Sequence, residues 1–464
     1  MPVNTITSNR SEPIVKAHDV AYVRFSAPDL DLMETFVKDF GLRVVHRDQD
    51  LLISRGLEAS PYLHVVHRGP AKFIGWSFLV NSEADLQKLA DEVPGCSPVH
   101  DIGGPEGNLG GGRRVHFIEP LTGFVLEAVH GQTAEAIAPE RPRPQYNQSG
   151  HDGRPGVLQD VGGNRSTLGG PGGPVQKDPG PPEVLRLAHC VAAVPPGTHH
   201  QFMRFLSETF GMLPTDVIQM NVPPGAEANF PPPLVQAFKE SDSNVLAQFM
   251  RMDRGKDYTD HHSVFVLPLM DPRAVGPGGA PQTQLSHASF EVFSMDDVFK
   301  GHMSFREKET AGAPYRHAWG IGRHVAGSQI YDYWHDPYGH VHEHMSDGDR
   351  INVDYGSMTV GGQSGRGPVG SNRCRVGDPP SRRPPVQPAL RRTVRRHQGF
   401  AGQSRLDRRK THHRVALSGR CCRRPGPRRR RRSGPRRSCG RGRPGRRSGR
   451  CRQSGKTSAR RNRR

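Results

Sequence analysis

The stretch Asp336-Pro-Tyr-Gly-His-Val-His-Glu343 matches an earlier one, Glu119-Pro-Leu-Thr-Gly-Phe-Val-Leu-Glu127, which is longer by one residue. In each, an acidic residue, a proline and a glycine precede a segment that ends on glutamate. Two more pairs occur in the same order: Ala17–Val20 with Ala188–Val191, and Ser77–Val80 with Ser289–Val292. Three matches in one order indicate a duplicated structural unit.

The predicted elements also recur in the same order. In the first unit, residues 14–131, the hydrophobic pattern predicts a strand at Val20–Phe25 and a helix at Leu30–Phe40. It predicts a last strand that continues from Val115–Phe117 through Phe124–Val129. The expected class is therefore α+β, with strands outnumbering helices.

The second unit, residues 184–350, repeats this order. A strand is predicted at Ala188–Val194 and a helix at His200–Phe210. A short helix is expected around Asp296–His302 and the closing strands at Ile330–Trp334 and His340–His344. Residues 132–183, rich in Gly and Pro, are expected to be a linker between the units.

Charge separates the last part of the chain from the rest. Residues 371–464 hold 34 of the 65 Lys and Arg and two of the 45 acidic residues, so this tail carries about +32 and the remainder about −12. Its Arg, Pro, Gly and Ser cannot bury enough apolar surface to fold, and we expect it to be disordered. Such a tail could bind nucleic acid through phosphates. Its composition also fits a frameshifted reading of GC-rich DNA, which is our alternative hypothesis.

Cysteine content and hydropathy indicate the compartment. Of seven cysteines, only Cys96 and Cys190 precede the tail, too few for a disulfide framework. The first residues contain no apolar signal segment, and no apolar run approaches the length of a membrane span. We expect a cytoplasmic protein without a membrane partner.

Three residues of the second unit have the side-chain types of an oxygen-activating metal site. His189, His287 and Glu343 fall on three separate predicted strands. Two imidazoles and one carboxylate on one face of a metal are typical of non-haem Fe(II) oxygenases. The matching positions of the first unit are His18, Gly75 and Glu127, so that unit lacks the middle ligand. The sequence therefore predicts one metal site, in the second unit.

The segments Leu285–Val292 and Trp319–Glu343 resemble the type I extradiol catechol dioxygenases of the vicinal oxygen chelate superfamily. The resemblance extends over about residues 14–350. It implies two tandem βαβββ-type vicinal oxygen chelate modules with curved mixed sheets. It further implies aromatic ring cleavage with O2 and a catechol substrate, in aromatic hydrocarbon catabolism, and commonly a homo-oligomer.

The resemblance also implies roles for individual residues. His189, His287 and Glu343 match the iron ligands, and Mn(II) is the alternative metal. His324 and Tyr333 match residues that hydrogen-bond the bound catecholate, and His262 matches the acid–base histidine. The adjacent His261 is the competing choice for His262; we prefer His262 because Ser263–Leu267 is the predicted strand.

Two other functions of the same superfamily remain open at this point. A glyoxalase or isomerase site with Zn2+, Ni2+ or Mn2+ often takes ligands from both modules, and His18 and Glu127 would then be required. The second is a binding protein that keeps the metal ligands but catalyses no reaction. It is suggested by the short segment Ser346–Gly356, the only residues left to cover the site before the composition changes.

Overall fold

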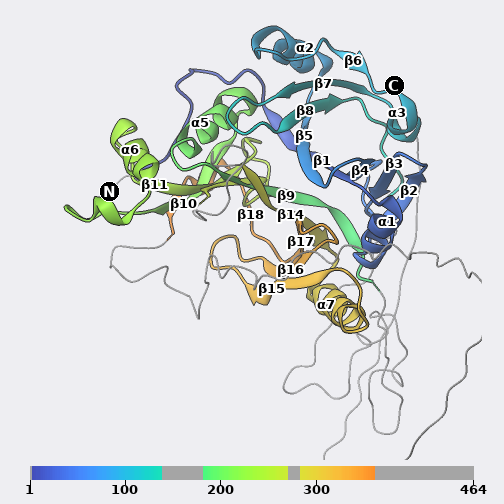
Figure 1. Ribbon diagram of the computed structural model, residues 1–464. Helices are drawn as coiled ribbons and strands as arrows, with labels where there is room; N and C mark the ends of the chain where they lie inside the picture. Colours follow the sequence, from blue (N-terminus) through green and yellow to red (C-terminus); the bar gives the residue numbers. More distant parts are fainter. Residues whose placement is uncertain (1–2, 138–180, 270–282, 361–464) are drawn as a thin grey trace, which may run out of the picture. The chain divides into compact units, whose positions relative to one another are not determined.

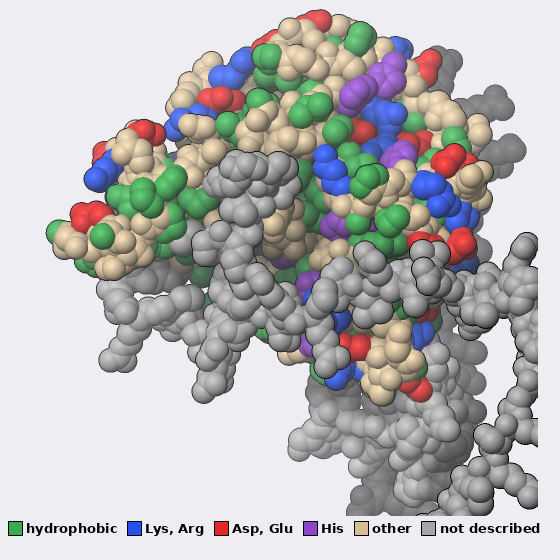
Figure 2. Space-filling model, viewed as in Figure 1, with side chains coloured by type: hydrophobic (Ala, Val, Ile, Leu, Met, Phe, Trp, Pro, Cys, Tyr) green, Lys and Arg blue, Asp and Glu red, His purple; other side chains and the backbone are tan. Residues whose placement is uncertain are grey.

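The computed structural model describes residues 3–137, 181–269 and 283–360 (Figure 1). The predicted linker lies mostly outside these residues, and the predicted basic tail lies wholly outside them. Disorder of the tail and nucleic-acid binding through it therefore stay predictions. On the face shown in Figure 2, acidic and basic side chains of the described residues are interspersed.

The first sheet is mixed and has the strand order β2-β3-β4-β1-β5-β8-β7-β6. Its strands are β1 (Ala17–Ala27), β2 (Arg43–Arg47), β3 (Leu51–Arg55), β4 (His64–Arg68), β5 (Lys72–Val80), β6 (His100–Asp101), β7 (Arg113–Ile118) and β8 (Val125–His130). The helices of this part are α1 (Leu30–Asp39), α2 (Glu83–Glu92) and α3 (Gly104–Gly110).

The second sheet has the order β15-β16-β17-β14-β9-β13-β11-β10-β19, and β12 pairs separately with β18. These strands are β9 (Val184–Val194), β10 (Leu213–Gln219), β11 (Val245–Arg251), β12 (Thr259–Asp260), β13 (Val264–Pro268), β14 (Gln284–Val292), β15 (Arg316–Arg323), β16 (Ile330–His335), β17 (Val341–Ser346), β18 (Arg350–Ile351) and β19 (Met358–Thr359). The helical elements are α5 (His199–Phe210), α6 (Pro232–Glu240), α7 (Met295–Thr310) and the 3-10 turns η1 (Glu227–Asn229) and η3 (Val353–Tyr355).

Both sheets are built on the same pairing pattern. In the first, β1 runs parallel to β4 and antiparallel to β5, and β5 runs parallel to β8. In the second, β9 runs parallel to β13 and antiparallel to β14, and β14 runs parallel to β17. The α+β class is confirmed, and residues of one sheet can be compared with those of the other through these pairings.

The local sequence explains where the main elements begin and end. The Asp29 carboxylate accepts hydrogen bonds from two backbone N–H groups at the start of α1. The chain leaves this helix at Gly41, whose φ of +97° suits glycine. The Glu119 side chain accepts hydrogen bonds from the N–H groups of Leu121 and Thr122 and so stabilises a tight turn.

That turn corrects one prediction. The expected continuous strand from Val115 through Val129 is two antiparallel strands, β7 and β8, joined at Glu119–Phe124. The predicted helix around Asp296–His302 is longer than expected and extends to Thr310. In the described part of the chain, no helix is long and apolar enough to cross a membrane.

Candidate metal centre

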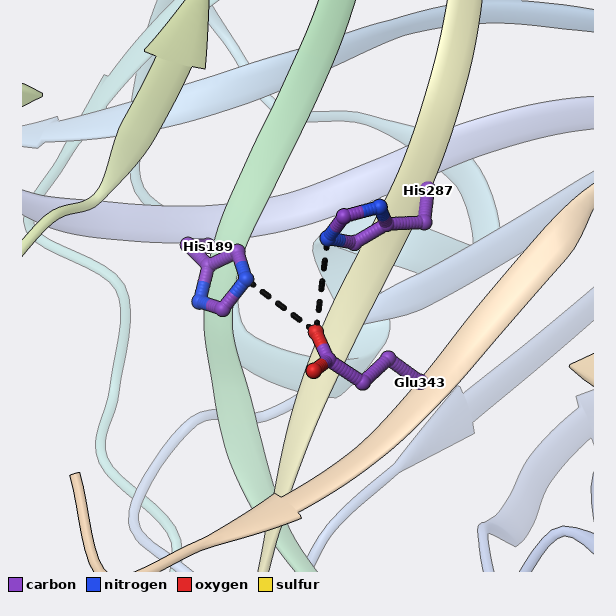
Figure 3. Close-up of side chains that lie close together, drawn as sticks. All are labelled: His189, His287 and Glu343. Atoms are coloured by element: carbon purple, nitrogen blue, oxygen red, sulfur yellow. Dashed lines mark ion pairs between the residues drawn. The ribbon is translucent and has the colours of Figure 1, made fainter. Parts of the chain in front are cut away.

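Three neighbouring strands, β9, β14 and β17, bring His189, His287 and Glu343 to one face of the second sheet (Figure 3). Ser289 on β14 pairs with His189 on one side and with Glu343 on the other. His287 lies two residues before Ser289 and therefore faces the same way. The strand register thus determines that the three side chains converge.

One carboxylate oxygen faces both imidazoles. Glu343 Oε2 lies 3.1 Å from His189 Nε2 and 3.4 Å from His287 Nε2. Glu343 is fully buried and His189 nearly so. Two nitrogens and one oxygen from rigid strands form the donor set that Fe(II) or Mn(II) accepts.

The hydrogen bonding of Glu343 fits a bound cation. Among the described residues, no donor makes a hydrogen bond to either of its buried oxygens. A buried carboxylate that accepts no hydrogen bond is costly, and a divalent ion would remove that cost. Burial raises the pKa of Glu343, but the adjacent His189 and His287 outweigh it and lower this pKa to about 2. Burial lowers the pKa of His287 to about 3. A charged carboxylate beside a neutral imidazole is the protonation state that metal binding requires.

The three other predicted site residues surround this group. The ring of His262 lies 4.1 Å from that of His189, and burial, followed by the neighbouring histidines, lowers its pKa well below the usual value. The Tyr333 hydroxyl is 2.9 Å from His324 Nε2, which is itself 3.9 Å from Glu343 Oε1. Tyr333 also pairs with Glu343 across β16 and β17. The structure therefore brings all six predicted side chains together.

Aromatic residues that sequence reasoning did not assign to the site form part of its wall. Trp319 stacks on Tyr333 at 5.3 Å and remains 39% exposed, so it both packs and faces solvent. Phe249 lies 4.9 Å from His262, edge to face. Tyr331 stacks on His324 at 4.0 Å and could have been assigned to the site from the alternation along β16, because it lies two residues before Tyr333. Phe249 comes from β11 and gave no such signal.

No family model matches the chain, and no curated protein is similar to it in sequence. Among solved structures, the Mn(II)-bound glyoxalase from Novosphingobium aromaticivorans is 18% identical with a TM-score of 0.51, over 74% of this chain and 87% of that one. Homoprotocatechuate 2,3-dioxygenase from Brevibacterium fuscum, in complex with 3,4-dihydroxyphenylacetate, is also 18% identical with a TM-score of 0.51, over 76% and 89%.

The chain has the vicinal oxygen chelate fold. The predicted tandem arrangement with curved mixed sheets is confirmed. At 18% identity the likeness concerns the fold alone.

The first vicinal oxygen chelate module differs from the second at the place that corresponds to the metal centre. The N–H of Val23 donates to Leu63 O, as that of Cys190 donates to Ser263 O. Tyr22 therefore corresponds to His189, and the predicted match of His18 to His189 is wrong. A side chain at Gly75, opposite His287 in the repeat, would collide with Val125 O.

An ion-pair network occupies this place in the first module. Arg24 Nε lies 2.8 Å from Glu127, and the same guanidinium binds Glu106. The Tyr22 hydroxyl also donates to Glu127. Arg114 Nη1 lies 3.0 Å from Glu106. The carboxylate that corresponds to Glu343 is thus already neutralised by a guanidinium, and no cation is needed there.

A second cluster of metal-ligand types lies on β15, β16 and α7. His302, His317 and Asp332 approach one another, and Asp332 points to the opposite face of β16 from Tyr333. The Asp332 carboxylate is close to His302 Nδ1 at 3.1 Å, to His317 Nε2 at 3.0 Å and to the Trp334 N–H. Burial raises the pKa of Asp332, but these hydrogen bonds lower it further than burial raises it. Three donors satisfy this carboxylate, in contrast to Glu343.

Proposed function

We propose that the second module is a mononuclear non-haem Fe(II) dioxygenase that cleaves catechol-type rings by the extradiol route. The observation that carries the proposal is the buried Glu343 carboxylate, which faces two imidazoles and receives no hydrogen bond from the described residues. The group of His262, His324 and Tyr333 around it supports oxygenase chemistry over a structural metal site. Mn(II) is the alternative metal for the same donors.

Each residue of the site would have a separate role. His189, His287 and Glu343 would hold the ion through two imidazole nitrogens and one carboxylate oxygen. When bound, Fe(II) would supply the charge that acidifies both catechol hydroxyls and the electrons that make O2 reactive. Holding the catechol and O2 next to each other in the site would replace their rare encounter in solution with a local one.

The remaining side chains would transfer protons and orient the substrate. His262 is neutral because it is buried, so it can accept a hydroxyl proton and later return one. The hydrogen-bonded pair of His324 and Tyr333 can hold a ring oxygen in place. Trp319 and Phe249 would limit the access of water from two sides.

A turnover assay tests the proposal. The protein is purified without oxygen, loaded with Fe(II), and given O2 and a panel of catechols. We expect a yellow ring-opened product and the uptake of one O2 per ring, because both oxygen atoms enter the product. A protein that binds one equivalent of iron yet opens none of the rings would contradict the proposal.

The Mn(II)-bound glyoxalase among the similar structures makes a glyoxalase-type reaction the second candidate. In that case ligands from both modules would be required, including Glu127. In this chain Glu127 is instead bound by Arg24 and Tyr22.

Glu127→Gln separates the two candidates. We expect turnover and metal content to stay close to those of the unaltered protein, since Glu127 is committed to the ion-pair network of the first module. Arg24 keeps Glu106 as a partner in this variant, so we expect it to fold. Loss of metal or of turnover in a folded Glu127→Gln protein would favour the glyoxalase-type site.

A further inference from the structure

Behind His262, a chain of hydrogen-bonding groups leads away from the metal centre. His262 Nδ1 lies 3.0 Å from Nδ1 of His261, and His261 Nε2 lies 3.1 Å from Asp216 Oδ2. The Tyr355 hydroxyl donates to the other oxygen of Asp216 at 3.0 Å. His261, His262 and Asp216 are each less than 5% exposed. The proposed metal site and its function make no use of His261, Asp216 or Tyr355.

Several elements hold this chain in place. The two histidines lie between β12 and β13, and the N–H of His261 donates to Asp349 O at 3.0 Å. Gly327 packs on the His261 ring with φ of +76°, and a Cβ at this position would approach His261 Nδ1 to 2.9 Å. Asp216 is fixed on β10 and Tyr355 in η3. The ring of His261 therefore has little freedom to turn.

The hydrogen-bond partners determine where the protons are. A carboxylate only accepts hydrogen bonds, so His261 donates to Asp216 through its Nε2–H. In the neutral imidazole the nitrogen that does not face Asp216, His261 Nδ1, has a lone pair and accepts. The facing nitrogen, His262 Nδ1, must then carry the hydrogen of the 3.0 Å contact. In a neutral His262 the other nitrogen, Nε2, is unprotonated.

We propose that Asp216 and His261 are positioning residues that fix His262 in the tautomer with its proton on Nδ1 and a lone pair on Nε2. The ring so oriented is the one that lies 4.1 Å from the metal ligand His189. This inference rests on the proposed function in one respect only: a histidine that acts as a base in this site needs a lone pair on Nε2. The tautomer itself follows from contacts that exist without metal or substrate.

The effect of Asp216 resembles that of the aspartate in a serine-protease triad, where the carboxylate selects the tautomer of the histidine. Here the selection passes through a second imidazole. If the carboxylate becomes an amide whose oxygen accepts from the Tyr355 hydroxyl, its NH2 group faces His261 and donates to it, which reverses the direction of both hydrogen bonds. His262 would then carry its proton on Nε2 and could not act as a base.

Nitrogen NMR of the full-length protein with 15N-labelled histidine tests the inference directly. The protein is loaded with diamagnetic Zn(II), and the His262 signals are identified by their absence in His262→Gln. We expect the protonated nitrogen of His262 to be Nδ1 in the unaltered protein. A proton on Nε2 would overturn the inference without any variant.

Two variants extend the test to activity. In Asp216→Asn we expect the tautomer of His262 to reverse and kcat to fall about 100-fold, the lower end of what a general base contributes, with KM little changed. Tyr355→Phe removes the other hydrogen bond to the same carboxylate and should change neither the tautomer nor kcat substantially. An Asp216→Asn protein with the original tautomer would overturn the inference. If the expected tautomer is found but no catechol is cleaved, the inference stands and the proposed function fails.

Discussion

His287→Ala is expected to abolish both tight metal binding and turnover. Removing His287 leaves His189 and Glu343, two donors where three converge. Loss of a group that merely supports a metal ligand costs roughly 10–100-fold in affinity or activity, so loss of a ligand should cost more. Metal content after dialysis and O2 uptake with a catechol would measure the two effects separately.

His302→Ala is the matched control, because it alters the other described cluster of two histidines and a carboxylate. There the hydrogen bonds from His317 and Trp334 to Asp332 remain after the substitution. We expect this variant to keep one equivalent of metal and its turnover. If it loses the metal while His287→Ala keeps it, the ion binds at Asp332 and the assignment of Glu343 is wrong.

The sequence was sufficient to predict which side chains converge at the candidate site, because the turn before β17 belongs to a motif that occurs twice in the chain. An acidic residue, a proline and a glycine mark the turn, and Glu343 follows at a fixed distance along a strand. Period-two alternation then determines which residues of β16 and β14 share its face. The choice of His262 over His261 depended on where β13 begins, and the structure places His262 beside His189 and His261 behind it.

Side-chain contacts over long sequence distances could not be predicted in the same way. His18 was matched to His189 on a short local similarity, but β1 and β5 shift register between Val20 and Val23. A β-bulge of this kind changes which residue faces the centre of the sheet, and hydropathy does not show it. The separation of β7 from β8 likewise depends on the Glu119 side chain binding backbone N–H groups. β15 was missed because its sequence, around Trp319-Gly-Ile-Gly322, is not typical of a strand.

Arg24→Ala is expected to destabilise the protein by about 3–5 kcal/mol, the usual cost of removing one partner from a buried ion pair. Arg24 binds both Glu106 and Glu127, and all three side chains are at most 10% exposed. Burial raises the pKa of Glu106, but Arg24 and Arg114 lower it to about 2, so this carboxylate is charged and depends on its cations. A lower midpoint of urea unfolding, followed by circular dichroism, would measure the loss.

Arg10→Ala is the control for the loss of an arginine as such. Arg10 binds Glu92 on the surface, where both side chains are more than 40% exposed, so its removal should cost about 0–1 kcal/mol. Equal unfolding midpoints for the two variants would show that the buried network contributes no more to stability than a surface ion pair. The expected difference has a structural meaning: the first module neutralises its central carboxylate, Glu127, with a guanidinium, whereas the proposed metal ion would neutralise Glu343 in the second. Arg24→Ala should therefore weaken the fold while the metal content of the folded protein stays unchanged.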